Sequence, residues 1–241
     1  YYLAVDFLKD GIRKNPRNYK LYFDLGYSIY NLKMKDYANA VKYLSEAIRH
    51  RHDRWVPRML YISLEQNKQY KEALAGWQDH LSKLPDSADS EAPRQTAERF
   101  IARNQGMLYE QEAEAAEKRA KGAKDPAEAA AANAEAERLW GEAIKTWEKM
   151  QKIDDDPYAV GRIMRRKALK LMEEGRYLEA IALLENARWK SNSFFEEASD
   201  LIIEAKQQAG VPLSVSEKKA VIRRQEAEKY RQAQQSAGTP I

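Results

Sequence analysis

A short apolar pattern recurs along the chain and limits the folds that it can adopt. In one copy, Tyr37 is followed by Ala40, Val41 and Leu44. The other copies keep the same order: an aromatic residue, a small residue three positions on, an apolar residue beside it, and a bulky apolar residue four positions beyond the small one. The four copies begin at Tyr1, Tyr37, Tyr70 and Tyr177. Spacings of three and four residues place such side chains on one face of an α-helix.

The composition agrees with helices whose outer faces meet water. Hydrophobic residues make up 44% of the 241 residues and charged residues make up 32%. The 10 glycines and 8 prolines fall between the apolar stretches, where turn residues belong, and no strand-like alternation persists. We therefore expect an all-α protein.

Charge and cysteine content exclude several classes of protein. The net charge of +4 comes from 41 basic and 37 acidic residues, whereas nucleic-acid binders are usually more one-sided. The sequence has no cysteine, so it has no disulfides and no thiolate metal sites. No apolar run approaches the ~18 residues that a membrane span needs.

The stretch that begins at Tyr22 is the most diagnostic. Leu25, Gly26 and Ile29 follow Tyr22 at helical spacing, and the Tyr37 copy of the pattern comes next. This stretch resembles the tetratricopeptide repeat, a pair of antiparallel helices of about 34 residues. Gly26 and Ala40 are small where the two helices of such a pair would cross, and bulky residues fill the space around them.

The resemblance extends over residues 1–85 and 139–210 and implies a right-handed α-solenoid of about five helix pairs. We expect N-terminal repeat units over residues 1–91. A unit with an elongated helical hairpin follows over 92–156, further units over 157–212, and a capping helix with a disordered tail over 213–241. The first unit is truncated, since Tyr1 falls inside a repeat, and we expect its first half to lie outside this sequence.

The unit over 92–156 has unusually long helical segments. We predict helices over 93–121 and 126–154, with apolar residues at the base of the hairpin and a tip rich in alanine and glutamate. The tip should project into solvent or against a partner. Asp125 and Asp156 each precede a proline and should cap helices, and Ser214 with Glu217 forms a capping box for the last helix.

Catalytic and metal-binding motifs are missing from the sequence. It has no phosphate loop and no catalytic triad signature, so we expect no enzyme activity, no cofactor and no metal. His50 and His52 lack a third ligand nearby in the sequence, and a solvated helix end is the simpler interpretation. The aspartates at 154–156 lack the spacing of a calcium loop and are better explained as a helix cap.

The strongest charge feature is the basic segment over 162–170. It carries Arg162, Arg165, Arg166, Lys167 and Lys170. Some tetratricopeptide proteins grip a C-terminal carboxylate with Lys and Arg at the second and sixth positions of a first helix, and this resemblance implies such roles for Arg162 and Arg166. The family's other three clamp positions hold Phe23, Tyr27 and Met59 here. A solvated basic face and an acidic-peptide site both remain open, and nucleic acid is disfavoured because no aromatic residues are interleaved.

Several aromatic residues do not fit the repeat core. Exposed tyrosine and tryptophan in a groove are frequent interface anchors. The candidate partner-binding residues are therefore Arg162, Arg165, Arg166, Lys170, Tyr19, Tyr27, Tyr30, Trp55 and Tyr61.

Two functions are compatible with these features. The first is a non-enzymatic scaffold or adaptor whose concave groove binds a peptide or helix, acidic in nature if the arginines contact it. The second is a structural subunit of a larger assembly, which residues upstream of Tyr1 could tether to a membrane. The sequence leaves homo-oligomerisation open, and it leaves the compartment open between cytoplasm and periplasm.

Overall fold

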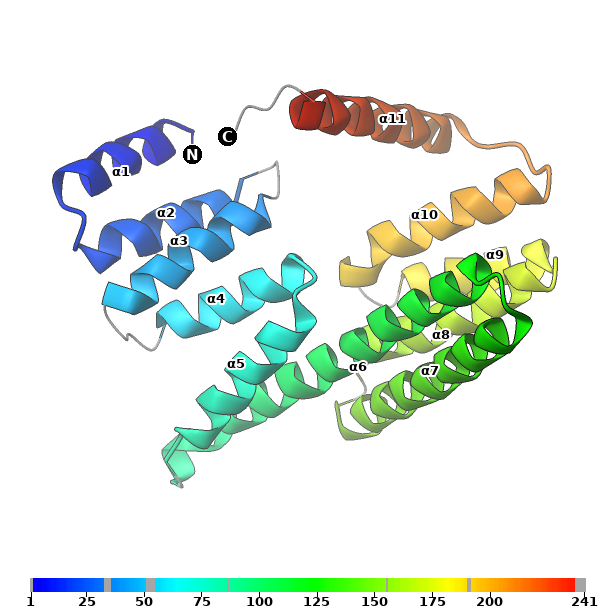
Figure 1. Cartoon of the computed structure of the whole chain (residues 1–241), viewed down its shortest axis with the longest axis horizontal. Helices are drawn as coiled ribbons and strands as arrows, with labels where there is room; N and C mark the ends of the chain where they lie inside the picture. The colour runs from blue at the N-terminus through cyan, green and yellow to red at the C-terminus, as the bar shows by residue number, and fades with distance from the viewer. Residues whose placement is uncertain are drawn as a thin grey trace. The chain divides into compact units, whose positions relative to one another are not determined.

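The computed structural model describes residues 2–32, 36–50, 55–85, 87–154, 156–189 and 192–236. Over these residues the chain forms eleven α-helices and one 3-10 turn and contains no strand, which confirms the all-α prediction (Figure 1). The elements are α1 (Tyr2–Lys14), α2 (Tyr19–Tyr30), α3 (Tyr37–His50), α4 (Trp55–Gln66), α5 (Tyr70–Ser82), η1 (Ala88–Ser90), α6 (Glu91–Gly122), α7 (Pro126–Asp154), α8 (Pro157–Glu173), α9 (Tyr177–Arg188), α10 (Asn192–Gln208) and α11 (Val215–Ser236).

The chain divides into two compact units, Tyr1–Met150 and Gln151–Ile241. In the first unit each helix from α1 to α5 packs against the next one in sequence, so that the series ends with α5 on α6. Helix α2 also touches α4. In the second unit α9 packs against both α8 and α10, and α8 touches α10.

The predicted caps fix three helix starts. Asp125 and Asp156 each accept a hydrogen bond from the backbone N–H two residues on, at 3.0 and 2.9 Å. In the capping box of α11, the backbone N–H of Ser214 donates to Glu217 at 2.7 Å, and that of Glu217 donates to Ser214 Oγ at 3.3 Å. Glu217 also binds Lys206 of α10 at 2.8 Å, which ties α11 to its neighbour. The expected disordered tail over 237–241 lies outside the described residues.

Small residues lie at the helix contacts, as the recurring pattern predicts. Ala40, Ala73 and Ala180 have no exposed surface, and Ala143 has 1%. A Cβ atom placed on Gly26 would lie 2.7 Å from Cγ of Leu44 and 3.2 Å from the carbonyl oxygen of Ala40. The first helix pair can therefore approach closely only because position 26 has no side chain.

The helix pair α4–α5 reaches the same close approach by the opposite arrangement. Tyr61 stands in α4 where the repeat pattern has glycine, and it is buried. A Cβ atom on Gly76 of α5 would lie 2.3 Å from the Tyr61 ring. In this pair the glycine at the close contact therefore belongs to the second helix, α5. Tyr61 and Trp77 pack edge to face with ring centroids 5.4 Å apart.

The two longest helices, α6 with 32 residues and α7 with 29, run side by side as a hairpin (Figure 1). Their lengths match the predicted hairpin. The tip is less solvated than expected, since Ala113 and Ala116 are fully buried and Ala120 is 9% exposed. Small side chains let neighbouring backbones approach closely, so the alanine-rich composition serves packing on this face of α6.

Gly106 and Gly141 offer a matched test of this packing. A Cβ atom on Gly106 would lie 2.5 Å from Cζ2 of Trp147, whereas one on Gly141 meets no atom within 4 Å. Gly106→Ala should lower the free energy of unfolding by about 1–3 kcal/mol through overpacking. Gly141→Ala should raise it by up to about 1 kcal/mol because alanine favours helix. Denaturant unfolding of both variants measures the effects, and shifts of equal sign would contradict the packing described.

Candidate functional site

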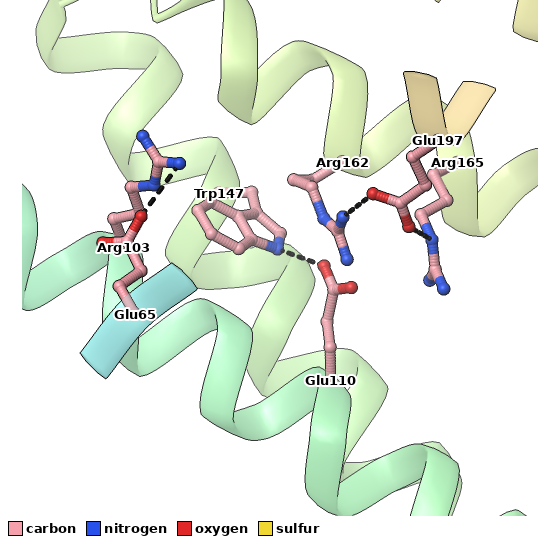
Figure 2. A network of polar contacts seen from close by, with 7 residues as sticks. All are labelled: Glu65, Arg103, Glu110, Trp147, Arg162, Arg165 and Glu197. Atoms are coloured by element: carbon pink, nitrogen blue, oxygen red, sulfur yellow. Dashed lines mark hydrogen bonds and ion pairs between the residues drawn. The ribbon is translucent and has the colours of Figure 1, made fainter. Parts of the chain in front are cut away.

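The predicted arginines of α8 surround one carboxylate of α10. Arg162 Nη1 lies 2.5 Å from Glu197 Oε2, and Arg165 Nε lies 2.5 Å from Glu197 Oε1 (Figure 2). The Arg162 side chain is 3% exposed and that of Arg165 is 12% exposed. Arg166 is also buried, with Nη1 4.0 Å from Glu173 Oε1. One carboxylate thus bridges two guanidinium groups between α8 and α10.

This arrangement gives the arginines an internal role. The pairs are partly buried, since the Glu197 side chain is 37% exposed, and removing Glu197 would leave the buried Arg162 without this partner. Arg162 also faces the Tyr158 ring, with Cζ 5.9 Å from the ring centroid. Lys170, on the same helix, is exposed. Of the four basic residues predicted to bind a partner, Lys170 is therefore the one that meets solvent freely.

The predicted aromatic residues fall into different environments. Tyr27 is 46% exposed and stacks on Phe23 with ring centroids 6.1 Å apart. Tyr19 and Tyr30 are partly buried, and Tyr30 packs against Tyr37 at 5.5 Å. Tyr61 belongs to the core of the α4–α5 pair, where burial raises the pKa of its hydroxyl. Trp55 begins α4, but its side chain lies outside the described part of the chain.

A buried polar cluster joins α4 to α6, and the sequence analysis did not identify it. The Glu65 side chain is 5% exposed and lies 2.9 Å from Nη2 of Arg103 (Figure 2). Asn104 has no exposed surface, and its Nδ2 donates to Glu65 Oε2 at 3.1 Å. Burial raises the pKa of Glu65, while the charge of Arg103 and the hydrogen bond from Asn104 oppose this rise. A glutamate next to a helix end in the sequence gives no sign of such burial.

The charges of this cluster act on Tyr30 of α2. Burial raises the pKa of the Tyr30 hydroxyl, the charges of Tyr37 and Glu65 raise it further, and the charge of Arg103 lowers it. Helices α2, α4 and α6 therefore contribute Tyr30, Glu65 and Arg103 to one region of the first unit. These are alternate helices of the chain, so a surface built from them runs across successive helix pairs.

The α6–α7 hairpin carries two hydrogen bonds from tryptophans to carboxylates, one of them buried. The indole N–H of Trp147 donates to Glu110 at 2.8 Å (Figure 2), and that of Trp140 donates to Glu117 at 2.7 Å. Glu110 is 3% exposed. The two glutamates and the two tryptophans are each seven residues apart, and this matched spacing in an antiparallel hairpin could have revealed both pairs from the sequence.

The described residues offer neither a metal site nor a membrane-spanning helix. Within the described ranges, no group of histidine, aspartate and glutamate side chains could hold a metal ion. His52 of the histidine pair and Asp155 of the aspartate run lie outside those ranges, and Asp156 serves as the cap of α8. No described helix combines the length and apolar character that crossing a membrane requires.

The raised pKa of Glu65 predicts how its contribution to stability changes with pH. A carboxyl whose pKa is higher in the folded than in the unfolded chain takes up its proton more readily when folded. Its contribution to the free energy of unfolding therefore increases as the pH falls from neutrality towards its ordinary pKa of 4.5. We expect the free energy of unfolding of wild type, measured relative to that of Glu65→Gln, to be larger at about pH 5 than at pH 7. The exposed Glu72→Gln is the control, and a constant difference between wild type and Glu65→Gln would refute the prediction.

No protein-family model matches the chain, and no curated protein matches it significantly. Its function is therefore inferred from helix packing and side-chain contacts.

Proposed function

We propose that the chain is a non-enzymatic scaffold of the tetratricopeptide type, a right-handed α-solenoid of about five helix pairs that binds a protein partner. The elongated α6–α7 hairpin would be one unit and α11 the cap. In support, successive helices from α1 to α6 and from α8 to α10 pack on one another, and close contacts recur at small residues, including Gly26, Ala40 and Gly76. Repeat arrays with this packing present extended surfaces that suit a peptide or a helix.

The partner-binding surface is assigned to α2, α4 and α6. The observation that carries this assignment is the half-exposed Tyr27, one turn from Tyr30, together with Arg103, whose side chain is 24% exposed while it pairs with the buried Glu65. Tyrosine supplies a large contact area at a small entropic cost, and arginine is a frequent interface anchor. Such a surface suits an extended peptide or one face of a helix.

Tyr27→Ala tests this surface. Wild type, Tyr27→Ala and the control Ile222→Ala, which removes an apolar side chain of α11 that is 53% exposed, serve as baits in extracts of the native source. Tyr27→Ala should weaken binding of the recovered partner by about tenfold or more, while Ile222→Ala should not change it. Titration of the purified partner gives the affinities. Equal affinities for the three baits would contradict the assignment, as would a native chain that brings down no partner.

A structural subunit of a larger assembly, which residues outside this chain could tether to a membrane, is the second candidate. The observation that favours it is the exposed apolar surface of α1, where Leu3 is 88% exposed and Phe7 is 78% exposed. Ala4 is exposed as well, although Ala40 and Ala180, at the same position of the recurring pattern, are fully buried. The exposure of Ala4, where Ala40 and Ala180 are buried, indicates that another helix packs on α1 in the assembly.

The α1 surface has its own test. Leu3→Ser with Phe7→Ser should release the chain from its native assembly if α1 is covered there, because burial of two such side chains is worth several kcal/mol, about 1.5–3 each. Leu178→Ser, at a site that is 67% exposed, is the control. Sedimentation of the native complex measures the release. An assembly that survives the α1 variant but dissociates with Tyr27→Ala would reject this second candidate.

A further inference from the structure

The junction of α9 and α10 exposes an aromatic pair. Trp189 follows α9 and is 73% exposed, and Phe195 in α10 is 37% exposed. Their rings pack edge to face with centroids 5.4 Å apart. Tryptophan is usually well buried and is enriched among the residues that dominate binding at interfaces.

Arg188 places a positive charge on this pair. Its Cζ lies 5.0 Å from the centroid of the Trp189 ring and 5.5 Å from that of Phe195, both within the range of cation–π contacts. No carboxylate of the described residues pairs with Arg188, and its buried Nε makes no hydrogen bond. By contrast, Arg176 at the other end of α9 binds Glu174 and Glu179 at 2.9 and 2.7 Å. Arg188 thus packs against aromatic rings and has no counter-ion among the residues that the structure describes.

We propose that Arg188, Trp189 and Phe195 form a docking patch for a protein segment in which one carboxylate is flanked by apolar side chains. The two rings limit the orientations that the guanidinium group of Arg188 can adopt. A planar guanidinium can donate two parallel hydrogen bonds to a carboxylate. The apolar neighbours of that carboxylate would cover Trp189 and Phe195. Removing water from the ion pair strengthens it.

The surrounding charges favour a single carboxylate over a polyanion. Glu185 is exposed three residues before Arg188 on α9, and Glu196 is exposed next to Phe195. These carboxylates would repel the dense negative charge of a nucleic acid or an anionic membrane. A peptide with one acidic residue can place its carboxylate on Arg188 and its apolar residues on the rings. The patch is distinct from the α2, α4 and α6 surface and depends on the proposed partner-binding function only in that both bind proteins.

The test uses the full chain and two labelled heptapeptides, Gly-Leu-Leu-Glu-Leu-Leu-Gly and its Gln twin, with capped ends. NMR titration to about 1 mM peptide follows the indole N–H of Trp189 and the Nε–H of Arg188. Both signals should shift with the Glu peptide, which should bind about fivefold more tightly than the Gln twin. Arg188→Gln should abolish this preference, Arg188→Lys should reduce it, and Trp189→Ala should weaken both peptides. Arg176→Gln and Leu178→Ala are matched controls on α9 and should change nothing.

Several outcomes would overturn the patch. They are equal binding of the two peptides to wild type, a preference that survives in Arg188→Gln, and the absence of any shift at about 1 mM. Tighter binding of a DNA dodecamer that requires Arg188 would assign the patch to a polyanion. Self-association of wild type that Trp189→Ala abolishes would assign it to a second copy. The melting curve of each variant confirms folding. Tyr27→Ala separates this proposal from the proposed function. The variant should lose the native partner but keep the preference of the Arg188 patch for the Glu peptide.

Discussion

Close approach between neighbouring helices at a residue with little or no side chain is the constraint on which the rest of the structure depends. Gly26 lets α2 meet Leu44 of α3, Gly76 makes room for Tyr61 between α4 and α5, and Gly106 faces the ring of Trp147. In each case a bulky side chain from one helix fills the space left by the other. Packing at crystal-like density makes these contacts intolerant of added atoms, so they specify which helix faces meet.

The sequence contained enough local information to predict the elements of this fold. Spacings around Tyr37 and Tyr177 set the helix faces, and Asp125 and Asp156 marked helix starts where the structure has them. The sequence alone could not show which helix of a pair carries the glycine at the point of close contact. Tyr61 was therefore grouped with exposed residues, although its compensating glycine lies only fifteen positions along the chain. That compensation depends on the contact between two helices and leaves no mark on the periodicity of either.

The candidate site was less predictable because charged side chains act through partners far apart in the sequence. The spacing of Arg162 and Arg165 identified a basic helix face, but Glu197, which binds both, belongs to α10. Glu65 and Arg103 lie on helices separated by α5 and were not singled out. A charge pattern on one helix shows which residues share a face. It does not show whether that face meets water, a partner or another helix of the same chain.

The two tryptophan–glutamate hydrogen bonds of the long hairpin have a mechanical consequence. Because they are seven residues apart on both helices, sliding α6 along α7 by one turn would break both at once and separate the buried carboxylate of Glu110 from the indole of Trp147. The two hydrogen bonds therefore oppose sliding of α6 along α7. Phe100 near its base stacks on Trp77 of α5 with parallel rings 4.5 Å apart, so a displacement of the tip would be carried directly into the neighbouring helix pair.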